Sequence, residues 1–134
     1  MTVSRYAALI LAVMCPVLGT ASAQADNEFP FGVDMMLETR PQPGSKRIPS
    51  LEIGDQGEAR LDLWCKRGSG QFSVANDTVI FVPGTMAETA CTPDTAQADD
   101  ALVNALAQAT NWKRQGDIVS FIGPTTLRFR VNTN

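Results

Sequence analysis

Two cysteines, Cys65 and Cys91, most constrain how this chain can fold. Residues 61–65 have the composition of a strand, residues 78–82 fit a central strand with both faces covered, and a helix is predicted just after Cys91. A bond between the two sulfurs would hold strands and helix together at one point. On the loop-entropy model, closing about 26 residues stabilises a domain by about 3.5 kcal/mol. Domains of this size are stable by only roughly 5–15 kcal/mol in total, so the bond would matter.

The N-terminal sequence predicts export to an oxidising compartment, where such a bond forms. Arg5 precedes an apolar run over residues 6–18, and residues 21–23 have the small-x-small pattern that signal peptidases recognise. We therefore expect residues 1–23 to be a signal peptide and the mature protein to be periplasmic or secreted. An even number of cysteines then remains, which predicts a Cys65–Cys91 disulfide.

Three alternatives to this interpretation are weaker. A membrane span needs about 20 apolar residues, but Pro16 and Gly19 interrupt the N-terminal run. Lipid attachment at Cys15 is disfavoured because Met14 is a poor residue before a lipidated cysteine. A redox-active thiol pair would usually have Cys-x-x-Cys spacing, which this chain lacks.

Cleavage would leave 111 of the 134 residues, which is enough for one domain and too few for two. We expect residues 24–30 to be a flexible lead-in and residues 31–134 to form a single, monomeric domain. Without Arg5 the mature chain has 10 basic and 14 acidic residues, a net charge of −4. This balance argues against nucleic acid as a partner, because nucleic-acid binding favours a basic domain.

The pattern of apolar residues predicts several strands and one helix. Thr92 is a good N-cap, Pro93 suits the first helical position, and alanines and leucines at spacings of three and four form an apolar stripe up to Thr110. Gly68-Ser69-Gly70 is expected to form a turn. Strands followed by one helix and two more strands predict an α+β domain with a largely antiparallel sheet and the helix packed on one face. The expected strands cover residues 31–38, 48–53, 59–64, 72–74, 78–82, 118–122 and 127–131.

Several short motifs occur in an order that resembles the META/HslJ family of small bacterial envelope proteins. They are Trp64-Cys65 followed by a glycine-containing turn, Ala90-Cys91 leading into the helix, and the closing strand pair at residues 116–121 and 127–129. The resemblance covers about residues 29–131. It implies a curved antiparallel sheet packed on a helix, without an established catalytic activity.

The residue types argue against catalysis and metal binding. The chain has no histidine, which excludes Ser-His-Asp and Cys-His sites and removes the commonest general base and metal ligand. Asp99 and Asp100 are adjacent on the helix and point about 100° apart, so we expect them to be solvated side chains near the helix N-terminus. No zinc spacing or calcium loop is present. We therefore predict a protein that is not an enzyme and needs no cofactor.

Basic residues occur in pairs that could form one binding rim. Three Lys-Arg pairs hold 6 of the 10 basic residues of the mature chain, and a tryptophan lies beside two of these pairs. Should the pairs meet in space, they would form an anion or partner site. The alternative is that they are independent, solvated charges. The candidate residues are Lys46, Arg47, Lys66, Arg67, Lys113, Arg114, Trp64 and Trp112.

Two functions follow from these observations. The first is an exported, non-enzymatic protein that binds an envelope protein or an anionic envelope component, or supports envelope integrity under stress. The alternative is a proteinaceous inhibitor of a secreted hydrolase, with a disulfide-pinned loop near Cys65 or Cys91 as its rigid insert.

The processing site can be tested directly. Because Ala21-Ser22-Ala23 is the best cleavage site, the exported protein should begin at Gln24. Intact mass and N-terminal sequencing of exported material measure this, and a lipidated Cys15 would contradict it.

Overall fold

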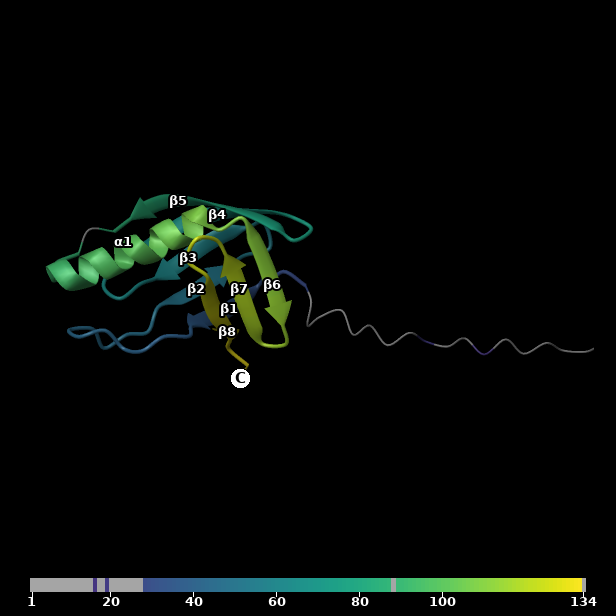
Figure 1. Cartoon of the computed structure of the whole chain (residues 1–134), viewed down its shortest axis with the longest axis horizontal. Helices are drawn as coiled ribbons and strands as arrows, with labels where there is room; N and C mark the ends of the chain where they lie inside the picture. Colours follow the sequence, from purple (N-terminus) through teal and green to yellow (C-terminus); the bar gives the residue numbers. More distant parts are fainter. Residues whose placement is uncertain (1–15, 17–18, 20–27, 88, 134) are drawn as a thin grey trace, which may run out of the picture.

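The computed structural model describes residues 16, 19, 28–87 and 89–133. Eight antiparallel strands form a closed barrel in which each strand pairs with its sequence neighbours and β8 returns to β1 (Figure 1). One helix is inserted between β5 and β6. The elements are β1 (Val33–Leu37), β2 (Ser50–Ile53), β3 (Glu58–Asp62), β4 (Arg67–Ala75), β5 (Thr78–Met86), α1 (Pro93–Gln108), β6 (Asn111–Gln115), β7 (Ile118–Ile122) and β8 (Leu127–Val131).

The expected open, curved sheet with a helix on one face is therefore wrong. The barrel closes where Met35 pairs with Val131 and Leu37 with Phe129, so the first and last strands are neighbours. Alternating apolar residues predict each of these two strands. The side chains do not show that the strands pair, because the backbone hydrogen bonds that join them are common to all residue types except proline.

Two further corrections concern the strands themselves. Gly68-Ser69-Gly70 belongs to β4 instead of a turn, and the chain reverses at residues 63–66. Strand β6 was missed because its sequence, Asn-Trp-Lys-Arg-Gln, has no apolar alternation; it pairs along its length with β7. The outer face of β5 is not covered, since Ile80 and Val82 are each 58% exposed.

Aromatic side chains fill the centre of the barrel. Phe121 is fully buried and its ring centroid lies 5.5 Å from that of Phe72 and 5.7 Å from that of Phe129. Phe29, from the expected lead-in, is also buried and stands edge-on to Trp112 at 5.1 Å. The packed domain thus includes residue 29, while residues 20–27 of the signal peptide and lead-in lie outside the described residues.

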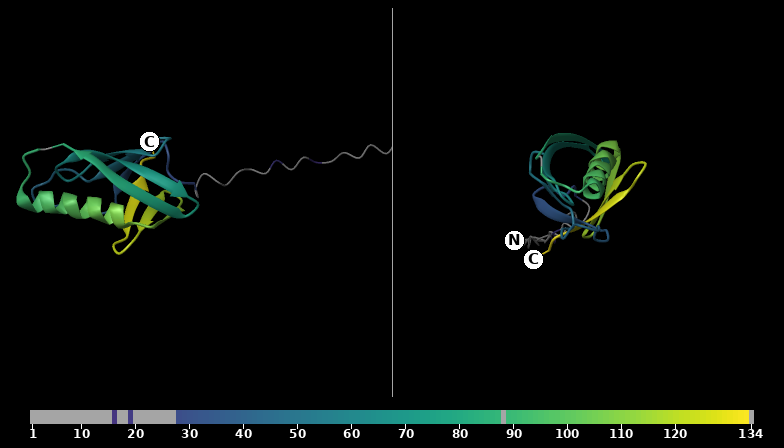
Figure 2. Two further views of the ribbon diagram at one scale, coloured as in Figure 1. Left: turned by 90° about the horizontal axis from the view of Figure 1, so that it is seen from above. Right: turned by 90° about the vertical axis from the view of Figure 1, so that its left-hand side faces the viewer.

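The helix forms as the sequence predicts. The Thr92 side chain accepts a hydrogen bond from the Thr95 N–H, and Pro93 occupies the first turn. Leu102, Ala105 and Leu106 face the core. Strands β5 and β6 share only the Thr78–Asn111 pair, and the helix lies alongside β5 beyond that point (Figure 2). In the described part of the chain, no helix is long and apolar enough to cross a membrane.

The burial of Phe29 leads to a stability prediction. Phe29→Ala should lower the free energy of unfolding by about 3 kcal/mol, because it removes a buried ring from the aromatic core. Phe31→Ala is the matched control: Phe31 is 42% exposed, and its loss should cost about 1 kcal/mol or less. Urea denaturation measures both, and equal losses would contradict the placement of Phe29 in the core.

Candidate functional site at the disulfide end

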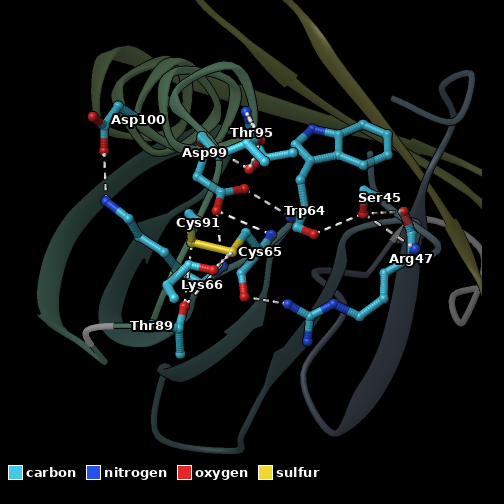
Figure 3. Close-up of a disulfide and its surroundings, with 12 residues drawn as sticks. Ser45, Arg47, Trp64, Cys65, Lys66, Thr89, Cys91, Thr95, Asp99 and Asp100 are labelled. Atoms are coloured by element: carbon cyan, nitrogen blue, oxygen red, sulfur yellow. Dashed lines mark hydrogen bonds and ion pairs between the residues drawn. A yellow bond between two sulfur atoms is a disulfide. The ribbon is translucent and has the colours of Figure 1, made fainter. Parts of the chain in front are cut away.

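The predicted disulfide is confirmed. Cys65 and Cys91 are bonded, with their Cα atoms 5.9 Å apart (Figure 3). The bond joins the connection between β3 and β4, residues 63–66, to the segment that leads into α1. We call this connection the Cys65 turn.

A buried carboxylate holds the same turn from the helix side. Asp99 is 1% exposed, and its two oxygens accept hydrogen bonds from the N–H groups of Trp64 at 2.7 Å, Cys65 at 3.1 Å and Lys66 at 2.8 Å. Hydrogen bonds to an ionised acceptor are among the stronger ones in proteins, and three of them offset the cost of burying the charge. Asp99 therefore fixes the position of the turn relative to α1.

The expectation that Asp99 and Asp100 are both solvated is wrong for Asp99. Only Asp100 is exposed, and its carboxylate lies 3.5 Å from the Lys66 ammonium. The sequence could have predicted the burial of Asp99 from its helical spacing. Thr95, Asp99 and Leu102 follow one another by four and three residues, which places Asp99 on the buried face.

The loop between β1 and β2 satisfies the carbonyl groups of the Cys65 turn. The Ser45 hydroxyl donates to the Trp64 carbonyl at 2.7 Å, and the Arg47 guanidinium donates to the Cys65 carbonyl. The turn is thus held by the disulfide, by a helix carboxylate and by side chains of a neighbouring loop (Figure 3).

These contacts bring two of the three Lys-Arg pairs together. The Arg47 guanidinium donates to the Cys65 carbonyl, so Lys46-Arg47 lies beside the backbone of Lys66-Arg67. The Lys66 side chain extends away from Arg47, toward Asp100 (Figure 3). We call these four residues the basic end. Lys66 pairs with Asp100, and Arg67 pairs with Asp62 at 2.8 Å. Among residues 28–87 and 89–133, no carboxylate lies within ion-pair distance of Lys46 or Arg47.

The third pair, Lys113-Arg114, does not join the basic end. It lies on β6, beyond the end of α1, whereas Lys66 contacts the helix at Asp99 and Asp100. The helix rises about 14 Å between residues 99 and 108, and Figure 1 shows β6 at the far end of the domain from the helix N-terminus. Arg114 instead donates to the Gly116 carbonyl at 2.9 Å.

Both tryptophans pack against other parts of the domain. Trp64 is 5% exposed, so its ring is not offered to a partner. Trp112 is half-buried against Phe29, and its indole N–H donates to the Asn76 carbonyl at 2.7 Å.

The comparisons with known proteins agree with this architecture. The sequence profile described as META domain matches residues 33–130. The chain belongs to the META domain family. This confirms the resemblance seen in the sequence. No curated protein matches the chain.

A solved structure shares the META domain fold of this chain. It is described as "NMR structure of the protein", and it superposes with a TM-score of 0.56 at 16% sequence identity. The match covers 74% of this chain and 88% of that one. At this identity the likeness concerns the fold alone.

Metal-ligating side chains are not grouped in the described part of this META domain. Among those residues, no three Cys, Asp or Glu side chains are arranged so that they could hold a metal ion. The disulfide end consists of a rigid turn with four basic residues and the three carboxylates Asp62, Asp99 and Asp100 around it.

The role of Asp99 can be tested in the oxidised protein. Asp99→Asn keeps the side-chain shape but removes the charge and turns an amide toward backbone donors, so it should lower the free energy of unfolding by about 3 kcal/mol. Asp100→Asn removes only the ion pair between the exposed Asp100 carboxylate and Lys66, and should change it by about 0.5 kcal/mol. Chemical denaturation compares the two, and similar losses would mean that Asp99 does not anchor the turn.

Proposed function

We propose that this META domain is an exported, non-enzymatic protein that binds an anionic component of the cell envelope and supports envelope integrity under stress. The site is the basic end. The observation that supports it most is the contact between Arg47 and the Cys65 carbonyl, which groups two Lys-Arg pairs that are about 20 residues apart in the sequence.

Rigidity favours binding at this position. The disulfide and the Asp99 hydrogen bonds hold the Cys65 turn, and Arg47 is tied to that turn. A ligand then meets cations whose backbone is already ordered, so less conformational entropy is lost on binding. In a mature chain with a net charge of −4, a local group of cations also directs an anionic ligand to one end of the molecule.

The inhibitor alternative receives less support. Such an inhibitor needs a loop that projects into the enzyme, but Leu63 and Trp64 of the Cys65 turn are buried and the Trp64 and Cys65 carbonyl groups are covered by Ser45 and Arg47. On the Cys91 side, residues 87, 89 and 90 are exposed, so this segment is where an insert would have to lie. A pull-down with the mature protein from periplasmic extract separates the two functions. Stoichiometric recovery of a hydrolase would favour the inhibitor.

Removal of two cations provides the direct test. Lys46→Ser combined with Lys66→Ser, neither of which lines the largest surface groove of strands β1 to β5, should weaken binding to vesicles that contain phosphatidylglycerol by about 30-fold, since each basic residue near an anionic surface contributes about 1 kcal/mol. The loss should shrink as salt rises. Vesicle co-sedimentation at several salt concentrations measures the effect.

The third Lys-Arg pair supplies the matched control. Lys113→Ser combined with Arg114→Ser removes the same charge from the other end of the domain and should leave most of the binding intact. Equal losses in both double variants, or no binding of the wild type to anionic vesicles, would contradict the proposal.

A further inference from the structure

A polar groove crosses the outer face of the barrel over strands β1 to β5. Its volume is about 640 Å³, and polar side chains line it apart from Ala87 and the bare backbone of Gly68. Volumes of 300–1,000 Å³ are typical of small-ligand sites. The groove shares Arg67 with the basic end, but Lys46, Arg47 and Lys66 do not line it.

The register between neighbouring strands explains both the shape of the groove and its charged and polar lining. Across β1, β2 and β3, Asp34 pairs with Glu52 and Glu52 pairs with Arg60, and Arg60 in turn lies opposite Ser69 on β4. In the next row, Ser50 lies opposite Asp62, which lies opposite Arg67. The serines are short: Ser69 lies next to the long Arg60 side chain, and Ser50 lies next to Asp62. The outer surface is therefore hollow at the serines and carries donors and acceptors around them.

The charged groups of the groove can exchange their partners. Arg60 pairs with Glu52 and Arg67 with Asp62, and the two guanidinium side chains are 71% and 70% exposed. Ion pairs this exposed contribute at most about 1 kcal/mol, so a ligand can replace them at little cost. The Glu52 carboxylate raises the pKa of Arg60, which therefore remains a cation.

One carboxylate of the groove has a neutral partner. Asp34 accepts a hydrogen bond from the Asn132 amide at 2.6 Å, and no cation of the described residues lies within ion-pair distance of it. Three carboxylates and two guanidinium groups give the groove a formal charge of −1. An anionic ligand would meet this excess of negative charge, and a purely apolar ligand would leave the charged groups without hydrogen-bond partners.

We infer that this groove binds a hydroxyl-rich glycan segment that is neutral or carries an amine. Sugar hydroxyl groups donate and accept hydrogen bonds at once, so adjacent hydroxyls can bridge carboxylate and guanidinium groups that stand side by side. Ser50, Ser69 and Thr85 supply further groups of the same kind. This site would give the protein a second contact with the envelope, chemically distinct from the basic end.

The tetrasaccharide of N-acetylglucosamine is the first probe. In an NMR titration of the mature protein, it should shift the backbone amides of the groove residues and leave those of Lys46 and Arg47 unchanged. Ser69→Tyr fills the hollow and should weaken this binding at least tenfold. Ser73→Tyr, on the same strand and also exposed but outside the groove, is the matched control and should bind like the wild type.

The charge of the groove is tested with the de-N-acetylated tetrasaccharide, which carries amines. It should bind more tightly than the acetylated form, and Asp34→Asn with Glu52→Gln should remove that difference. These isosteric changes test the site even if Ser69→Tyr does not fold. The inference is overturned if neither tetrasaccharide shifts the groove residues, or if a sulfated tetrasaccharide binds there more tightly than both. Binding of anionic vesicles at the basic end is measured separately, so either proposal can fail alone.

Discussion

The contact between the Asp99 carboxylate and the Cys65 turn is the interaction on which the disulfide end depends. Three backbone N–H groups point at the two oxygens of the buried Asp99 side chain, and without that carboxylate they would lose their hydrogen-bond acceptor within the protein. The disulfide holds the same turn through a covalent bond. Two constraints of different kinds therefore fix the helix against the barrel, and the position of Arg47 follows from the turn that they hold.

Local patterns in the sequence predicted the helix and most strands, because capping and periodicity act between near neighbours. Thr92 and Pro93 start α1 as expected, and Leu102 and Leu106 face the core. Barrel closure could not be predicted in this way, because it depends on backbone pairing between β1 and β8, some 90 residues apart. Composition also fails to predict that the polar residues of β6 form a strand. It likewise fails to predict that Ile80 on β5, a β-branched residue, is exposed.

The candidate site was predicted in part, and for a clear physical reason. Cysteine parity and the expected export signal were enough to predict the Cys65–Cys91 bond, since chemistry leaves few alternatives. The burial of Asp99 was missed because two adjacent aspartates usually indicate a solvated surface, although its spacing from Thr95 and Leu102 placed it on the apolar face. Lys113 lies far from the other two Lys-Arg pairs because the length of α1 separates them in space. The similar composition of the three pairs gives no sign of this distance.

The interior of the barrel explains why both proposed binding sites lie on its outside. Eight strands enclose a space just wide enough for side chains, and here the rings of Phe29, Phe72, Phe81, Phe121 and Phe129 occupy it. An interior packed in this way stabilises the domain but offers little room to a ligand. Outward-facing residues are free of that packing, so their charges and hydroxyl groups can vary without cost to the fold. The groove over β1 to β5 consists largely of such residues, whereas in the basic end Arg47 also holds the Cys65 turn. A rigid, filled barrel thus favours binding by surface chemistry over binding by enclosure.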